Sequence, residues 1–351
     1  MSFVLSEKVR SLSPYEPISG EFDIRLDANE SYFPLSREIM EEFCLKLNEL
    51  ELNRYPDGSE RELISAFAKR YDLDENCICA GNGSDELISV IIGALLPKDS
   101  KILTLEPDFS MYRQYAYAFE KAGLREEKDD SFSFNPKEIA KRINAEGIDC
   151  LIFSNPCNPT GAEIKKSDIL YLAQNTDALI IADEAYMEFS DGKCSVLKEA
   201  EEQKGLIVLK TLSKAVGLAG ARLGFAVCEK ETAKALNALR SPYNLNSMSQ
   251  LLGKIVLSRG EELDLSIKNI KIQTNRLYSF LAESRLSYIK NVFPTRANFV
   301  LIEPKDAKEL WERLAKRKIA VRQLGKYIRI SAPAPEEEAR LFEALRELDK
   351  A

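Results

Sequence analysis

The sequence predicts an α/β fold, with a large domain built on a mostly parallel, mixed sheet flanked by helices and a smaller α+β domain. Three observations predict this fold. The chain has 351 residues, 45% of them hydrophobic, and cores usually divide above about 250–300 residues. From about residue 85 onward, apolar runs of strand length alternate with helical patterns, as they do in parallel sheets. Beyond about residue 285 the rhythm changes to that of an α+β unit.

The elements follow in order along the chain. Apolar side chains at helical spacing predict helices over residues 37–50 and 60–71. Apolar runs predict the strands of the large sheet at 101–105, 149–153, 178–182, 206–210 and 223–227. A long helical stretch follows at 247–285, and then strands at 288–293, 299–302 and 327–330 and helices at 306–317 and 335–349. We expect a large domain over residues 30–240, and a small domain that combines residues 1–29 with 241–351.

The composition argues against several classes of function. The net charge is −7 and no basic tract stands out, which disfavours nucleic-acid binding. The longest apolar run, Val90 to Leu96, is too short to span a bilayer, and early charges disfavour a secretory signal. Seven scattered cysteines are typical of thiols in a reducing cytosol. We therefore expect a cytoplasmic protein that binds neither nucleic acid nor membrane.

The chain contains no histidine. This excludes Ser-His-Asp and Cys-His nucleophilic schemes and histidine-ligated metal sites, and we expect no metal. Proton transfer near neutral pH must then come from a carboxylate, a tyrosine, a cysteine or a lysine of depressed pKa. A lysine tuned by a cofactor would meet this need.

Three successive predicted strands end in polar residues. The ends read SNPCNPTG, DEAY and TLSK. Alone, each is an ordinary turn, helix cap or surface dipeptide. In an open α/β sheet, however, ligands bind beyond the carboxyl ends of the strands, so these residues are expected to face one crevice. The side chains concerned are Asn158, Asp183, Tyr186, Ser213 and Lys214.

A fourth polar segment, GNGSDE at residues 81–86, opens the helix that runs through Leu96. Its glycines permit a tight backbone, Ser84 can cap the helix, and free N–H groups can hold an anion. An ordinary capped helix explains the segment equally well when it is taken alone. Together the four segments supply a phosphate cradle, a lysine, an acid and hydrogen-bond donors, which an aromatic aldehyde with a phosphate requires.

These segments carry a resemblance to a known family. The sequence resembles the class I/II aminotransferases of pyridoxal phosphate (PLP) fold type I, and within them the histidinol-phosphate aminotransferase branch. The lysine segment is specific to the fold type, and LDANE with RYPDG narrows it to the branch. The matching stretches run from about residue 14 to 331: LDANE at 26–30, RYPDG at 54–58, GNGSDE at 81–86, NPTG at 158–161, DEAY at 183–186, TLSKAVGLAGARLGF at 211–225, ANFV at 297–300 and YIRI at 327–330.

The resemblance implies catalytic roles. Lys214 would hold PLP as a Schiff base and, once displaced by substrate, act as the general base. Asp183 would pair with the pyridine nitrogen, so that the ring can accept electrons. Asn158 and Tyr186 would hydrogen-bond the phenolic oxygen. Phe109, in a stretch that reads Pro-Asp-Phe where the family has a PTY-type stretch, would stack on the ring without the usual phenol.

The resemblance also implies how the cofactor phosphate is held, with Arg222 as the fixed charge and Asp85 acting through its backbone N–H. The phosphate-binding residues would be Gly83, Ser84, Asp85, Ser213 and Arg222. Tyr55 would reach the phosphate of a neighbouring subunit, which implies a symmetric homodimer.

For the substrates, an amino donor and a 2-oxo acid, Arg329 matches the arginine that clamps a carboxylate. Asn29 would also contact substrate. The donor's phosphate would be met by Tyr15 and Arg322, with Tyr55 nearby. The family usually has a longer loop between the two arginines, which here are only seven residues apart, so a solvated strand-end charge is an equal explanation for Arg322.

The resemblance implies histidinol-phosphate:2-oxoglutarate aminotransferase activity in histidine biosynthesis. Three alternatives stay open. One is an aminotransferase for aromatic or other amino acids, which the short loop favours. Another is a lyase like threonine-phosphate decarboxylase. The last is a degenerate PLP-binding module, which has no need for Lys214, Asp183 and Arg222 together.

Overall fold

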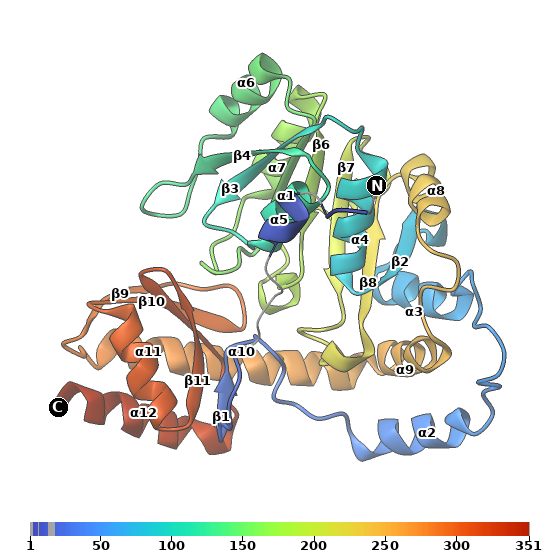
Figure 1. The fold of residues 1–351 in the computed structure, drawn as a ribbon. Helices are drawn as coiled ribbons and strands as arrows, with labels where there is room; N and C mark the ends of the chain where they lie inside the picture. The colour runs from blue at the N-terminus through green and yellow to red at the C-terminus, as the bar shows by residue number, and fades with distance from the viewer. Residues whose placement is uncertain (1–2, 6, 13–17, 351) are drawn as a thin grey trace.

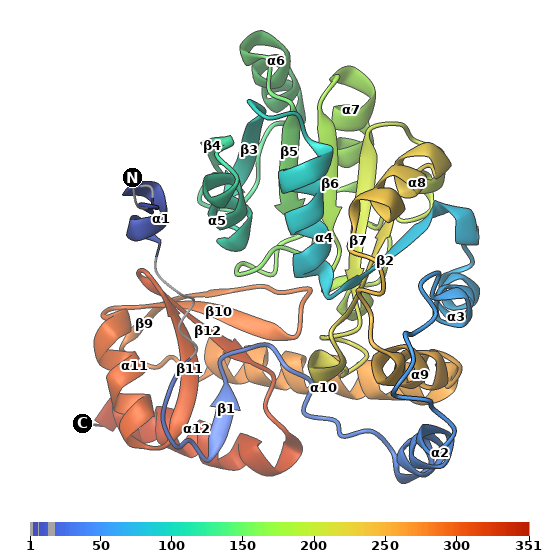
Figure 2. The same cartoon turned by 45° about the vertical axis from the view of Figure 1, so that its right-hand side comes forward.

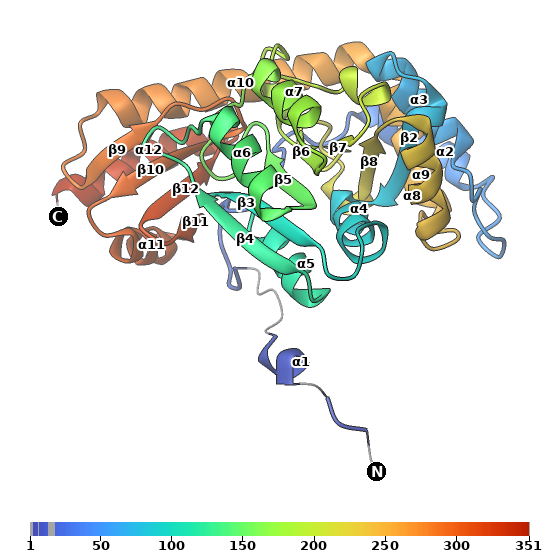
Figure 3. The ribbon, with the colours of Figure 1, turned by 90° about the horizontal axis from the view of Figure 1, so that it is seen from above.

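The computed structural model describes residues 3–5, 7–12 and 18–350, so Tyr15, predicted to bind substrate, lies outside the described residues. Two sheets lie side by side, one of seven strands and one of five. Helix α10 (Gly260–Glu283) runs below the large sheet and behind the small one in the view of Figure 1. Seen from above, the same helix runs along one side of the whole molecule (Figure 3).

The seven-stranded sheet has the strand order β2-β8-β7-β6-β5-β3-β4. Strands β7, β6, β5, β3 and β4 are parallel, and β8 is antiparallel to both of its neighbours. The predicted mostly parallel, mixed sheet is therefore confirmed. The strands are β2 (Ile78–Asn82), β3 (Lys101–Glu106), β4 (Ala122–Glu127), β5 (Cys150–Ser154), β6 (Leu179–Asp183), β7 (Leu206–Thr211) and β8 (Leu223–Val227).

Helices cover both faces of this sheet, as the near-continuous apolar sequences of its central strands require. One face packs against α3 (Arg61–Tyr71), α6 (Pro136–Glu146) and α7 (Lys166–Asn175). The other face packs against α4 (Ser84–Val90), α5 (Met111–Ala118) and α8 (Lys230–Leu239). The helix predicted through Leu96 is α4 continued by a π-helical turn, Ile91–Leu95.

The five-stranded sheet has the order β1-β11-β12-β10-β9. Strand β1 pairs in parallel with β11, which brings the N-terminal segment against the C-terminal part of the chain (Figure 2). Its apolar core includes residues of α10, α11 (Ala307–Lys316) and α12 (Pro335–Lys350). The strands are β1 (Ile24–Leu26), β9 (Ile289–Phe293), β10 (Phe299–Pro304), β11 (Ile319–Leu324) and β12 (Tyr327–Ser331).

Helix packing bears on the division into domains. The stretch predicted as one helix over 247–285 is divided into α9 (Ser247–Leu257) and α10. Helix α9 packs on α2 (Arg37–Leu47) and α3, and its buried face joins the core of the large sheet. A boundary between residues 240 and 241 remains a prediction, but α9 itself packs with the large unit. A short helix, α1 (Glu7–Ser11), lies beside α5 (Figure 2).

Candidate active site

A cavity of about 480 Å³ opens at the carboxyl ends of β5, β6 and β7 and reaches the small sheet. The neighbouring order of these three strands brings together the polar ends that the sequence separates. The predicted site residues that line the cavity are Asn29, Ser84, Asp85, Phe109, Asn158, Asp183, Tyr186, Ser213, Lys214, Arg222 and Arg329. Gly83 adjoins it, whereas Tyr55 and Arg322 are not part of its lining.

Asp183 ends β6 and is 4% exposed. Its Oδ2 accepts a hydrogen bond from the Tyr112 hydroxyl at 2.8 Å, and its Oδ1 accepts one from the Ala185 N–H at 3.1 Å. Burial raises the pKa of Asp183 from 3.8 to about 7. Within the described part of the chain, no lysine or arginine forms an ion pair with this carboxylate. A buried carboxylate of this kind suits a cationic ring nitrogen, which would restore the charged form.

Asn158 and Tyr186 both present a hydrogen-bond donor to the cavity. The Asn158 side-chain oxygen accepts from Arg329, which leaves its amide N–H groups to face the cavity. The Tyr186 oxygen accepts from the Asn29 side chain at 3.0 Å, which leaves its own hydrogen to donate. Two converging donors match the phenolate oxygen of a pyridoxal ring.

Lys214 follows β7, and its Nζ donates to the Ala28 carbonyl oxygen at 2.8 Å. Ala28 comes two residues after β1, so this bond joins the large sheet to the segment that belongs to the small one. The amine and the Asp183 carboxylate line the same cavity, as they would if both acted on one bound ring.

The predicted phosphate cradle forms where β2 meets α4. Gly83 precedes the helix at φ 82°, and a Cβ there would collide with the Arg222 guanidinium. The Arg222 guanidinium contacts Ser213 Oγ at 3.4 Å and the Asp85 carboxylate at 3.2 Å. Backbone N–H groups, hydroxyls and a fixed cation fit a phosphate, and the space exists only because residue 83 is glycine.

The two arginines of the small sheet are neighbours. Strands β11 and β12 form a hairpin with a two-residue turn at Gly325 and Lys326, where Gly325 has φ 60°. In its register Arg322 lies directly opposite Arg329, so both side chains leave the same face of the sheet. Arg329 is 7% exposed and donates to the Asp27 carbonyl oxygen at 2.7 Å. The short spacing therefore pairs the arginines instead of separating them.

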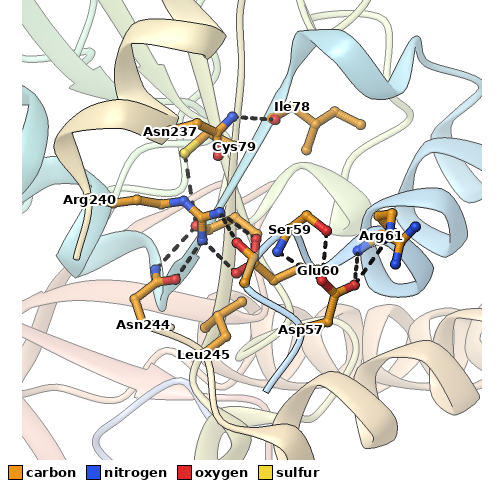
Figure 4. Close-up of polar contacts among 12 residues, drawn as sticks. Asp57, Ser59, Glu60, Arg61, Ile78, Cys79, Asn237, Arg240, Asn244 and Leu245 are labelled. Atoms are coloured by element: carbon orange, nitrogen blue, oxygen red, sulfur yellow. Dashed lines mark hydrogen bonds and ion pairs between the residues drawn. The ribbon is translucent and has the colours of Figure 1, made fainter. Parts of the chain in front are cut away.

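The segment that carries Tyr55 is held away from the cavity of its own chain. Tyr55 is 81% exposed and stacks on Tyr243 with ring centroids 4.6 Å apart. Arg240 anchors the same segment by donating two hydrogen bonds to the fully buried Glu60, at 2.7 and 2.6 Å (Figure 4). Arg240 also bonds Asn244, whose amide reaches Glu86 in the phosphate-cradle segment. One network therefore supports both the exposed tyrosine and the cradle.

Several cavity residues were not predicted. Tyr112 lies near the start of α5, three residues after Phe109, and no periodic pattern in the sequence marks the direction of its side chain. Its ring meets Phe109 edge-on at 5.4 Å. Burial raises the pKa of Tyr112 well above its usual value, so the phenol stays a donor to Asp183. Ser154 and Thr211, the last residues of β5 and β7, also line the cavity.

Comparison with known proteins agrees with this geometry. The family described as aminotransferase class I and II matches residues 23–348. The chain belongs to the class I and II aminotransferases. Histidinol-phosphate aminotransferase of Clostridium novyi (strain NT) is 37% identical over 343 residues, 96% of this chain and 95% of that protein. The resemblance drawn from the sequence is confirmed.

Solved aminotransferase structures share the fold. Histidinol-phosphate aminotransferase from Sinorhizobium meliloti, crystallised with pyridoxal-5'-phosphate, superposes with a TM-score of 0.86 at 21% identity over 98% of both chains. L-threonine-O-3-phosphate decarboxylase from Porphyromonas gingivalis gives 0.81 at 21% identity, covering 93% of this chain and all of that one. Since a transaminase and a decarboxylase share it, this fold does not by itself select the reaction.

The cavity of this aminotransferase fits PLP group by group. The glycine-lined cradle suits the phosphate, the buried carboxylate suits the ring nitrogen, and the paired donors suit the phenolic oxygen. Within the described residues, no cluster of three or more potential ligands could hold a metal ion. None of the described helices is long and apolar enough to cross a membrane.

Proposed function

We propose that the chain is a PLP-dependent aminotransferase that moves the amino group of histidinol phosphate to 2-oxoglutarate, in histidine biosynthesis. The observation that carries this choice of substrates is the register of β11 and β12, which sets Arg322 opposite Arg329. Histidinol phosphate brings a phosphate and 2-oxoglutarate brings carboxylates, and two arginines on one face of the small sheet suit both anions. Similarity over nearly the full length to a histidinol-phosphate aminotransferase supports the same choice.

The residues divide the work. Bound PLP supplies a ring that accepts electron density from the bond broken at the amino-bearing carbon. Lys214 Nζ would act as the general base that takes the proton from that carbon. Asp183 would stabilise the positive charge of the ring nitrogen, while Asn158 and Tyr186 would donate hydrogen bonds to the phenolic oxygen. Arg329 binds the carboxylate of the 2-oxo acid and keeps the scissile bond oriented.

An amino-donor panel tests the substrate. Protein loaded with PLP should convert to its pyridoxamine form with histidinol phosphate, and respond poorly to tyrosine or phenylalanine. Faster conversion by an aromatic amino acid would move the proposal to an aromatic aminotransferase. Release of carbon dioxide from threonine phosphate would replace transamination with decarboxylation. Protein that stays colourless with added PLP would overturn the cofactor assignment as well.

We also infer a homodimer in which Tyr55 enters the site of the partner subunit. In a single chain Tyr55 is 81% exposed and does not line the cavity, and Leu52 nearby is 65% exposed. Such apolar exposure is typical of an interface. A hybrid of Tyr55→Ala and Lys214→Ala chains would then contain one complete site and regain activity. An inactive hybrid of confirmed composition would place Tyr55 outside the partner's site.

A cytoplasmic location belongs to the same proposal. All seven cysteines are free thiols, and most of them are buried. This use of cysteine suits a reducing compartment. Cell fractionation, with activity expected in the soluble cytoplasmic fraction, tests it.

A further inference from the structure

A buried ion pair lies beside the cavity and has no role in the mechanism described above. Asp108 follows β3 and Lys128 follows β4. Their side chains are each 1% exposed, and Lys128 Nζ lies 3.3 Å from Asp108 Oδ2. Removing two charges from water is costly unless both groups also form further hydrogen bonds. The residues that form those bonds therefore indicate which parts of the chain the ion pair positions.

The hydrogen bonds of Asp108 end on residues that form the cavity. Its Oδ1 accepts from the Phe109 N–H at 2.8 Å and also from the Ser154 hydroxyl. A serine hydroxyl has one hydrogen, and Ser154 donates it in the hydrogen bond to Asp108. Ser154 Oγ is therefore left as an acceptor, and it accepts from the Asn158 N–H at 2.9 Å. Asp108 thus fixes Phe109 directly and Asn158 through one serine.

Lys128 closes the same network from the other side. Its Nζ donates to the Pro107 carbonyl oxygen at 3.0 Å and lies 3.3 Å from Cys157 Sγ. Burial acts to lower the pKa of Lys128, but the Cys157 thiol and the Asp108 carboxylate outweigh it and raise the pKa, so the ammonium stays charged. Pro107 and Cys157 come two residues before Phe109 and one before Asn158. The lysine therefore joins the two loops that carry these residues.

We propose that Asp108 and Lys128 are positioning residues that set the spacing between Phe109 and Asn158, and through it the seat of the cofactor ring. Phe109 and Asn158 follow adjacent strands, β3 and β5, and both line the cavity. Phe109 would cover the face of the ring, and Asn158 would donate a hydrogen bond to its phenolic oxygen. The inference rests on the proposed PLP function, because only a bound ring gives the spacing a consequence.

Two variants test the chain of contacts. Asp108→Asn turns an amide toward the Lys128 ammonium and weakens the hold on Ser154. Ser154→Ala removes the acceptor for the Asn158 N–H without changing any charge. In both we expect PLP bound to the protein to change its visible spectrum at a pH higher by roughly half a unit to one unit. The dissociation constant for PLP, from titration of the cofactor-free protein, should rise about tenfold.

The matched control is Glu188→Gln. Glu188 forms a comparably buried pair with Lys210, at 2.5 Å with side chains 10% and 3% exposed, and also accepts from the Tyr71 hydroxyl at 2.8 Å. None of these three residues lines the cavity. This variant should lose thermal stability but keep the spectral midpoint and PLP affinity of the parent protein. If a general loss of rigidity were the cause, the spectral midpoint and the PLP affinity would change in the control as well as in the other variants.

The outcomes separate cleanly. Folded Asp108→Asn and Ser154→Ala proteins with the parent's midpoint and affinity would show that the pair is structural only. If Asp108→Asn does not fold, the Asp108→Asn/Lys128→Met protein buries no charge and is measured beside Ser154→Ala under the same criteria. A parent protein that binds no PLP would overturn the proposed function itself, whereas a parent that binds PLP beside unaffected variants would overturn only this inference.

Discussion

Replacing Asp183 by asparagine should stabilise the cofactor-free protein at neutral pH. Burial raises the Asp183 pKa from 3.8 to about 7. Between about pH 4 and pH 7, the folded protein therefore holds a proton that the unfolded chain has released. Its free energy of unfolding falls as the pH rises through that window, by a total of roughly 4 kcal/mol. Asp183→Asn removes this titration and its cost.

Part of this gain in unfolding free energy is offset because Asp183→Asn rearranges a hydrogen bond. The new amide oxygen must face the Ala185 N–H, so the amide nitrogen faces the Tyr112 oxygen and the original bond from Tyr112 is lost. A rearranged hydrogen bond of this kind costs roughly 1–1.5 kcal/mol. The variant should therefore be more stable than the parent by roughly 2–3 kcal/mol near pH 7.5. Near pH 4.5 it should be no more stable, because Asp183 is then neutral in the folded parent.

Urea unfolding of both proteins, stripped of PLP and held at one protein concentration, measures this difference across pH 4.5–8. With saturating PLP the order should reverse, because a ligand that binds only the folded state adds to its stability and Asp183 is needed for that binding. A difference in unfolding free energy that stays constant across the pH range would refute the reasoning, since Asp183 would then not titrate between the two states.

Three further predictions concern other parts of the site. Gly83→Ala places a Cβ against the Arg222 guanidinium in a left-handed backbone conformation, so PLP affinity should fall by at least about tenfold in a titration of the cofactor-free protein. Arg240→Met leaves Glu60 buried without its cation and should lower the free energy of unfolding by about 3–5 kcal/mol in urea. The double change Arg240→Met/Glu60→Gln should recover part of that loss, and an equally unstable double variant would contradict the role of the pair. Arg329→Lys keeps the charge but loses the planar fork, so KM for 2-oxoglutarate should rise roughly tenfold or more; an unchanged KM would mean that the carboxylate binds elsewhere.

The sequence predicted most of the cavity because of one property of parallel sheets. Residues at the carboxyl ends of neighbouring parallel strands meet at one edge, so chain order alone placed Asn158, Asp183 and Lys214 together. The prediction required only that strands consecutive in sequence be neighbours in the sheet, as short connections favour. It did not require the exact first and last residue of each strand.

Other features depended on information that a linear pattern lacks. Tyr112 and Asp108 act through the direction of a side chain near a helix start, which periodicity does not give. The position of Arg322 follows from hairpin register, and the seven-residue spacing that argued against it is what a two-residue turn produces. Strand β4 reads AGLREE, and an edge strand with one exposed face can be too polar to resemble a core strand.

The bond from Lys214 Nζ to the Ala28 carbonyl oxygen ties this lysine to the segment that follows β1. The same nitrogen, proposed above as the catalytic base, therefore also joins the large sheet to the segment that pairs with the small one. An amine bound covalently to a cofactor has fewer hydrogens to donate. A Schiff base at Lys214 would therefore weaken or replace the hydrogen bond to the Ala28 carbonyl oxygen. This contact between the two sheets would then depend on whether Lys214 carries the cofactor.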